Sequence, residues 1–233
     1  MELLKKIDFK PEDTLYLLGD AVDRGKHSIK CLRYIMKSPN VHMLLGNHED
    51  MMLQQSSVKN SGLYLKNDEF TDVWIKYNGG KKTIQELSEY SNTEQLEVYN
   101  FLQKLPYFFE IRIKNTNFIL VHAGLLIKKG WRKLAAEDVL KKQTKENILW
   151  IRDDFFNKEG LPGKVIIFGH TPTMTITKRQ NEFDIWHDTK YNDKICIDGG
   201  CVFGGVLHAI CLDTMEEFHV RKGFVSADAP AGG

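Results

Sequence analysis

Four short apolar segments of this chain each run into a polar cluster that contains glycine. The segments have the length of a buried strand and cover Thr14–Leu18, Val41–Leu45, Phe118–Val121 and Val165–Phe168. The clusters that follow them are GDAVDRG (19–25), GNHED (46–50), VHAG (121–124) and GHTPT (169–173). A helix-like stretch at 28–37 separates the first two segments. Because α/β sheets gather their sites at the carboxyl ends of strands, this order predicts an α/β fold with one polar site.

The rest of the chain predicts an insertion and a second sheet. Residues from about 50 to 105 are polar and rich in helix formers, which indicates a helical insertion or cap. A further strand is expected at 107–113, and short alternating segments beyond it predict a second, largely antiparallel sheet. Those segments are Met174–Thr177, Phe183–His187, Lys194–Ile197, Val206–Leu212 and Glu216–Val220. We expect one domain over 1–225 and a disordered tail at 226–233.

Composition excludes some classes of function without choosing one. Lys and Arg number 32 against 31 Asp and Glu, so no overall field favours nucleic acid or acidic lipid. No run of 18 apolar residues is present, and the first residues lack the apolar core of a signal peptide. We therefore expect a cytoplasmic protein with no nucleic-acid and no membrane partner, in which local groups bind any phosphate.

The polar side chains of the four clusters suit a divalent metal better than helix capping. Taken singly, an Asp after a strand often caps a helix, and a lone His usually finds a local partner. Taken together, the four clusters present Asp20, Asn47, His122 and His170, an oxygen and nitrogen set without thiolate. Such a set suits Mn²⁺, Fe²⁺ or Zn²⁺. The sequence thus predicts a metal site at the strand ends.

The clusters also resemble the motifs of the phosphoprotein phosphatases, the family of the eukaryotic serine/threonine phosphatases and their small bacterial and phage relatives. The matching segments are Gly19–Gly25 (GDxVDRG), Gly46–Glu49 (GNHE), Val121–Gly124 (HAG), Gly169–Thr171 (the late histidine motif) and Trp150–Arg152 (WIR, similar to LWxR). The resemblance extends from about residue 14 to about residue 205. It implies a calcineurin-like metallophosphoesterase sandwich of two mixed β-sheets flanked by helices.

The resemblance implies a metal role for the four candidate ligands. Asp20 would bridge two divalent metal ions, since a carboxylate has two oxygens, and Asn47, His122 and His170 would complete the second site. The ions expected in the family are Mn²⁺, or Fe²⁺ or Zn²⁺. A water between them would attack phosphorus directly, without a phosphoenzyme.

The same resemblance implies four further catalytic residues. Arg24 and Arg152 would clamp the phosphate, because a guanidinium fork matches two phosphate oxygens. His48 would act as the general acid that protonates the departing serine or threonine oxygen. Asp23 would hold the His48 ring in the correct tautomer and keep it cationic.

One element of the family pattern does not occur in this sequence. Members carry a GDxHG motif on a strand before the first cluster, and its Asp and His bind the first metal. Here the sequence opens with MELLKKIDF, which resembles the second half of the helix after that motif. A shortened or internal start, a genuine one-metal variant, and a strand donated by another chain all stay open. We expect a weak first metal site and self-association through the exposed sheet position.

Three functions follow from these motifs. The first is a serine/threonine protein phosphatase that acts on phosphorylated proteins or small phosphoesters. The second is a symmetrical bis(5'-nucleosyl)-tetraphosphatase on the same scaffold, against which Asp23 and Glu49 argue, because those enzymes resemble GDxVARG and GNHD at these places. The third is a catalytically weak scaffold that binds phosphate through Arg24 and Arg152.

Overall fold

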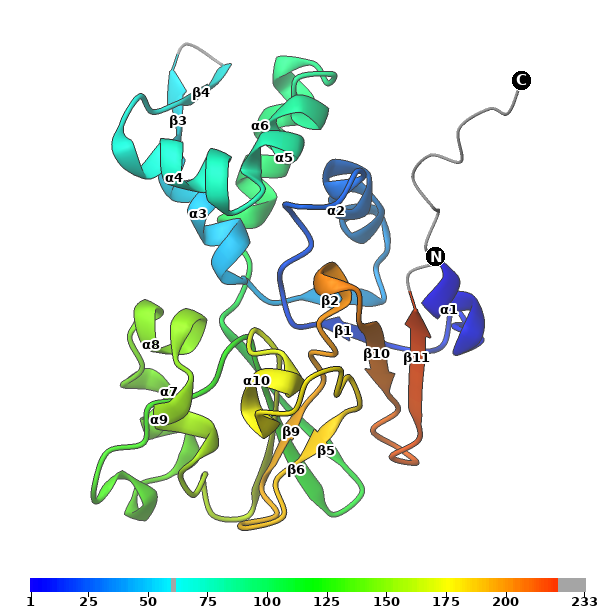
Figure 1. Ribbon diagram of the computed structural model, residues 1–233, viewed down its shortest axis with the longest axis vertical. Helices are drawn as coiled ribbons and strands as arrows, with labels where there is room; N and C mark the ends of the chain where they lie inside the picture. Colours follow the sequence, from blue (N-terminus) through cyan, green and yellow to red (C-terminus); the bar gives the residue numbers. More distant parts are fainter. Residues whose placement is uncertain (60–61, 222–233) are drawn as a thin grey trace.

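Two β-sheets share an apolar core in the computed structural model, which describes residues 1–59 and 62–221 (Figure 1). The strands are β1 (Leu15–Leu17), β2 (Val41–Met43), β3 (Ser56–Lys59), β4 (Gly62–Leu65), β5 (Phe108–Ile113), β6 (Thr116–Val121), β7 (Lys164–Phe168), β8 (Trp186–His187), β9 (Lys194–Cys196), β10 (Val206–Ile210) and β11 (Glu217–Arg221). The helices are α1 (Glu2–Lys6), α2 (Ser28–Lys37), α3 (Asn47–Gln55), α4 (Glu69–Tyr77), α5 (Gly80–Leu87), α6 (Asn92–Leu102), α7 (Ala136–Lys141), α8 (Lys145–Trp150), α9 (Asp153–Phe156) and α10 (Thr173–Thr177).

The larger sheet is mixed, and the smaller sheet is parallel. The larger has the order β5-β6-β7-β9-β8, in which β6, β7 and β9 run parallel and the edge strands β5 and β8 run antiparallel. The smaller pairs β1 with β2 through the crossover helix α2. Strands β10 and β11 form a separate antiparallel hairpin. Among the described strands, β1 is hydrogen-bonded only to β2.

Alternating side chains along the strands divide the apolar interior into layers. On β6, Phe118 and Leu120 face the core shared by the sheets, whereas Ile119 and Val121 face helices α7, α8 and α9. Helices α2 and α6 cover the other side of the small sheet. This two-residue period is what a strand buried on both faces requires. The layers are therefore helices, small sheet, large sheet and helices, with α7–α9 on one side in Figure 1.

The predicted α/β class is confirmed, and so are the four strands that precede the polar clusters. The predicted strand Met174–Thr177 is wrong, because that segment is helix α10. Pro172 precedes this helix, where its fixed φ suits a helix start. The expected second sheet also differs. Of the strands formed by the segments expected in that sheet, β8 and β9 join the larger sheet, whereas β10 and β11 pair with each other.

The segment from 50 to 105 contains helices α4, α5 and α6, together with a β3–β4 hairpin that the sequence did not indicate. These elements group at the top of Figure 1. The extent of a single domain over 1–225 stays a prediction, and the expected tail at 226–233 lies outside the described residues. In residues 1–59 and 62–221, no helix is long and apolar enough to cross a bilayer.

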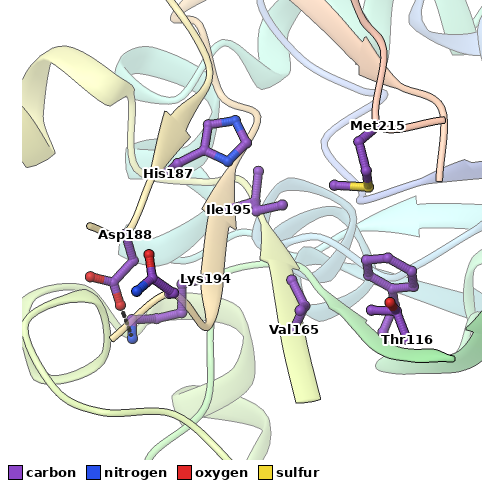
Figure 2. A pocket seen from close by; sticks show the side chains of 9 residues that line it. Thr116, Val165, His187, Asp188, Lys194, Ile195 and Met215 are labelled. Carbon is purple, nitrogen blue, oxygen red and sulfur yellow. Dashed lines mark ion pairs between the residues drawn. The ribbon is translucent and has the colours of Figure 1, made fainter. Parts of the chain in front are cut away.

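A buried ion pair links the start of β9 to the residue that follows β8. The Lys194 side chain is fully buried, and its Nζ lies 2.8 Å from Asp188 Oδ2 and also contacts the Asp193 carboxylate. Figure 2 shows this pair at a pocket of about 290 Å³, whose lining includes Thr116, Val165 and none of the predicted site residues. A lysine without these carboxylates would be costly to bury.

Replacing the buried cation should lower the stability of the whole fold. Lys194→Met keeps the apolar stem but leaves two carboxylates without their counter-ion, so the free energy of unfolding should fall by about 3 kcal/mol. Urea unfolding measures this change. The control is Lys158→Ala, which removes an exposed ion pair to Asp154 and should change stability little. Equally small losses of unfolding free energy in both variants would show that the buried Lys194 ion pair does not stabilise the fold.

Candidate active site

The loops after β1 and β2 touch backbone to backbone. Gly19 has φ +98°, and a Cβ built on it would lie 2.6 Å from the Gly46 Cα. A Cβ on Gly46 would lie 2.5 Å from the Asp20 backbone nitrogen. No side chain fits at either position, so the two glycines allow the loops to meet. This contact brings Asp20 beside the start of helix α3, which carries Asn47 and His48.

Several candidate site residues have unusual backbone conformations. Asp20, Asp23, Arg24 and His170 all have positive φ, between 58° and 69°. For residues other than glycine this left-handed region is sparsely populated, and it persists only where surrounding contacts enforce it. Such strain is concentrated at functional sites more often than elsewhere. The four residues thus have conformations that the rest of the fold must hold in place.

The buried Glu49 carboxylate holds the first two loops together. Its Oε2 accepts hydrogen bonds from the backbone N–H of Asp20 at 2.8 Å and of Gly46 at 3.0 Å. Its Oε1 accepts from Ala21 at 2.7 Å and from Val22 at 3.1 Å. Burial and then the nearby Asp20 carboxylate raise the pKa of Glu49 to about 7, although the backbone donors oppose this shift. One side chain therefore positions a whole loop.

The structure brings the four predicted metal ligands together. Potential ligand atoms of Asp20, His122 and His170 all lie within 4.8 Å of one another. Asn47 Oδ1 lies 2.9 Å from His122 Nε2 and 3.0 Å from His170 Nδ1. Asp20 Oδ1 lies 3.5 Å from His122 Nε2, and 29% of the Asp20 side chain is exposed. The four side chains come from the ends of four strands, as the sequence predicted.

The chemistry of this cluster fits a cation. His122 Nδ1 lies 2.7 Å from the Leu18 carbonyl oxygen, which can only accept, so Nδ1 carries a proton and Nε2 is the ring nitrogen that a cation could bind. Asn47 Oδ1 and Asp20 Oδ1 lie 2.9 and 3.5 Å from His122 Nε2, so potential ligand atoms of three side chains converge there. Burial first, then His122 and Arg152, lower the pKa of His170 to about 3, which keeps this ring neutral. Converging acceptors of this kind suit a divalent ion.

Asp23 and His48 form a buried pair beside the cluster. His48 Nδ1 lies 2.6 Å from Asp23 Oδ2, and the two side chains are almost fully buried. Burial alone would lower the pKa of His48, but the hydrogen bond to Asp23 and the charges of Asp20 and Asp23 outweigh it, and the pKa is raised. The pair therefore favours the protonated form of the His48 imidazole.

The two candidate arginines occupy different settings. Arg152 donates from Nη1 to Thr171 Oγ1 at 3.2 Å, next to His170, and its side chain is otherwise exposed. The Arg24 guanidinium lies 5.5 Å from the centre of the Phe203 ring. None of the hydrogen bonds among the described residues joins it to the metal-ligand candidates.

Sequence reasoning missed two residues that contact the site. Trp74 and Thr83, from α4 and α5, both donate hydrogen bonds to the Asp23 carboxylate. They lie in the insertion, outside every motif, so no local pattern marked them. Glu49 belongs to a motif, but its loop-bracing role appears only from its four hydrogen bonds.

Comparison with known proteins finds a family and two kinds of relative. A family model described as calcineurin-like phosphoesterase matches residues 1–205. Serine/threonine-protein phosphatase 1 of Salmonella typhimurium is 29% identical over 213 residues, which cover 89% of this chain and 82% of that protein. The symmetrical bis(5'-nucleosyl)-tetraphosphatase of Haemophilus ducreyi is 35% identical over 127 residues, 53% of this chain and 39% of that protein. The chain thus matches less than half the length of this second relative.

Longer matches to the second kind of relative have lower identity. The symmetrical bis(5'-nucleosyl)-tetraphosphatase of Neisseria meningitidis is 25% identical over 270 residues, which cover 94% of this chain and 89% of that protein. A crystal structure of a candidate diadenosine tetraphosphatase has a TM-score of 0.60 and 21% identity, covering 94% of this chain and 86% of that chain. A metallophosphoesterase from Sphaerobacter thermophilus has a TM-score of 0.51 and 16% identity, covering 94% and 81%. Both structures support the predicted sandwich fold.

Glu49→Gln should damage both the fold and the metal site. The amide nitrogen would face backbone N–H donors, so we expect the free energy of unfolding to fall by about 3 kcal/mol. Calorimetric titration should also show Mn²⁺ affinity falling by roughly 10-fold or more, because the Asp20 loop loses its brace.

Glu86→Gln is the matched control for this variant. Glu86 also accepts two backbone N–H bonds, but from Ile29 and Lys30 at the start of α2, away from the cluster. The Glu86→Gln variant should be less stable than the parent protein but should bind Mn²⁺ with the same affinity. Equal affinity losses in the two variants would show that Glu49 has no particular role at the cluster.

Proposed function

The chain belongs to the calcineurin-like phosphoesterase family, and on that basis we propose that it hydrolyses phosphoserine and phosphothreonine esters of proteins. The observation that carries this proposal is the buried Asp23–His48 pair beside four converging metal-ligand candidates. Direct attack of water on a phosphoserine must expel an alkoxide, a poor leaving group that requires a proton donor. A phosphoanhydride expels a phosphate group and needs no such donor. The pair therefore favours phosphoesters of serine and threonine.

Asp20, Asn47, His122 and His170 would hold the divalent cation in this proposal. Such ions, Mn²⁺ or else Fe²⁺ or Zn²⁺, would supply an activated water and offset the charge of the phosphate when bound. The protein orients its own groups for this task. The Leu18 carbonyl orients the His122 ring, and 29% of the Asp20 side chain stays exposed beside the cluster.

Arg24 and Arg152 would bind the phosphate oxygens. Arg152 is hydrogen-bonded to Thr171 beside His170, which places a guanidinium at the edge of the cluster. Arg24 follows Asp20 in the same braced loop, and its guanidinium rests on Phe203. Two planar cations near one phosphate can stabilise the charge that develops in the transition state. His48 would donate its proton to the departing oxygen while Asp23 holds the ring.

A symmetrical dinucleoside tetraphosphatase is the second candidate. It is supported by the relatives of that name, one of which matches 94% of this chain. The Asp23–His48 pair counts against it for the reason given above. A scaffold that binds phosphate without catalysis is less well supported, because the residues proposed to act on the phosphate are all present. A cytoplasmic location and the absence of nucleic-acid and membrane partners stay predictions.

The choice of substrate can be measured with the full chain and excess Mn²⁺. We expect turnover of a phosphoserine peptide to exceed that of diadenosine tetraphosphate. His48→Asn should lower kcat on the peptide by roughly 100-fold or more, since general acid catalysis contributes about that much. Faster cleavage of diadenosine tetraphosphate, with no effect of His48→Asn, would overturn the proposal in favour of the second candidate.

The proposed ligands can be tested without any substrate. In calorimetric titration with Mn²⁺, His170→Ala should weaken binding by more than the roughly 10–100-fold that changes to outer-shell partners cost. His187→Ala is the matched control, because His187 is partly exposed and pairs with Glu217 on another part of the surface. Unchanged Mn²⁺ affinity in His170→Ala would remove His170 from the site.

A further inference from the structure

Two residues of the insertion hold the carboxylate that binds His48. We propose that Trp74 and Thr83 are positioning residues, which fix the Asp23 carboxylate so that the His48 ring is held ready to donate a proton. This inference rests on the proposed function, in which His48 protonates the leaving oxygen. Through these two residues, a helical insertion that contains none of the motifs would contribute to the reaction.

The hydrogen bonds around Asp23 occupy both carboxylate oxygens. Oδ2 lies 2.6 Å from His48 Nδ1 and accepts from Trp74 Nε1 at 2.8 Å. Oδ1 accepts from Thr83 Oγ1 at 2.7 Å, and the same hydroxyl oxygen accepts from the Asp23 backbone N–H at 2.9 Å. Three donors from three helices thus define the plane of one carboxylate. With fewer donors, the carboxylate could rotate about its side-chain bonds.

The surroundings make this arrangement dry and rigid. Trp74 is 1% exposed and Thr83 is fully buried, while Asp23 and His48 are 5% and 3% exposed. A buried hydrogen bond is stronger than one in water, and a lost partner leaves an unsatisfied polar group. Because water has little access to Asp23, it cannot readily replace a missing donor. Removal of either donor should therefore change how His48 is held.

The backbone of Asp23 needs an external support. Its φ is 69° and that of the next residue, Arg24, is 58°, both in the left-handed region. Within this loop, Val22 is the last residue whose backbone N–H donates to the Glu49 carboxylate. The backbone N–H of Asp23, the next residue, donates to Thr83 Oγ1 instead. The insertion also supports Arg24, whose backbone N–H donates to Gly79 O at 3.3 Å. The turn before α5 and the helix itself therefore brace the second half of the loop, through Gly79 and Thr83.

The packing of Trp74 shows that its indole cannot easily move away. A Cβ built on Gly80 would lie 2.5 Å from the Trp74 ring, so the start of α5 lies directly against the indole. This close approach aims Nε1 at Asp23 and ties the two anchors into one unit. The position of His48, the proposed general acid, then depends on α3, α4 and α5 together. A small displacement of a catalytic group can cost a large part of its effect.

The test compares two substrates that differ in their need for a proton donor. A phosphoserine peptide requires protonation of its leaving oxygen, whereas p-nitrophenyl phosphate releases a stable phenolate. With excess Mn²⁺, Thr83→Val and Trp74→Phe should each lower kcat on the peptide by about tenfold, a part of the effect of general acid catalysis. The same variants should lower kcat on p-nitrophenyl phosphate by less than about twofold, because that reaction needs no acid. Thr83→Ser keeps the hydroxyl and should restore the parent ratio of rates.

Thr71→Val is the matched control. Thr71 is a buried threonine of the same insertion. Its hydroxyl lies 3.1 Å from Gln55 Oε1 and 2.9 Å from Asp68 Oδ1, and none of the hydrogen bonds among the described residues joins it to Asp23. It should leave the ratio of the two rates unchanged even if it lowers stability. If Thr83→Val and Thr71→Val lower both rates by the same factor, the role of Thr83 is structural and the inference is wrong.

A spectroscopic measurement separates this inference from the proposed function. In the proton NMR spectrum of the folded chain, the His48 Nδ1–H bonded to Asp23 should give a far-downfield signal. Thr83→Val and Trp74→Phe should shift or broaden this signal, and Thr71→Val should not. If the parent hydrolyses neither substrate, the proposed function fails, yet the signal still decides whether the anchors hold the pair. An unchanged signal in both anchor variants would overturn the inference.

Discussion

The candidate site depends on the hydrogen bonds between one buried carboxylate and the backbone of the loop after β1. Glu49 accepts from Asp20, Ala21, Val22 and Gly46, so it fixes the first metal-ligand candidate relative to the helix that carries the next. Without this link, the two glycine-containing loops would lose the three hydrogen bonds that Glu49 accepts from Asp20, Ala21 and Val22 across their contact. The close approach of Gly19 and Gly46 makes the contact sterically possible, and the carboxylate makes it specific.

The strained backbone of the site shows how the remaining fold contributes. Asp20, Asp23, Arg24 and His170 keep left-handed conformations because neighbouring groups compensate for the strain. For Asp20 that neighbour is Glu49 from α3, and for Asp23 it is Thr83 from the insertion. The two halves of the loop are thus supported by different helices, α3 and α5. We infer that the insertion serves the geometry of the site, in addition to any role in covering it.

Sequence reasoning could predict the parts of the fold that depend on local patterns. The strands before the polar clusters were identifiable from short apolar runs, and the four metal-ligand candidates from the glycine-rich turns after them. The segment Met174–Thr177 was misjudged because its alternating polar and apolar residues suit a strand as well as one helical turn after Pro172. Trp74 and Thr83 could not be predicted at all, because they lie 51 and 60 residues from Asp23 along the chain and act only through tertiary contact.

The central claim is that Asp20, Asn47, His122 and His170 converge on a divalent cation at the ends of the strands. The most direct test is an anomalous-difference map from a crystal of the full chain grown with Mn²⁺, recorded at the manganese absorption edge. The account predicts an anomalous peak bounded by those four side chains. A map with no peak among them, or with manganese only at other residues, would contradict it.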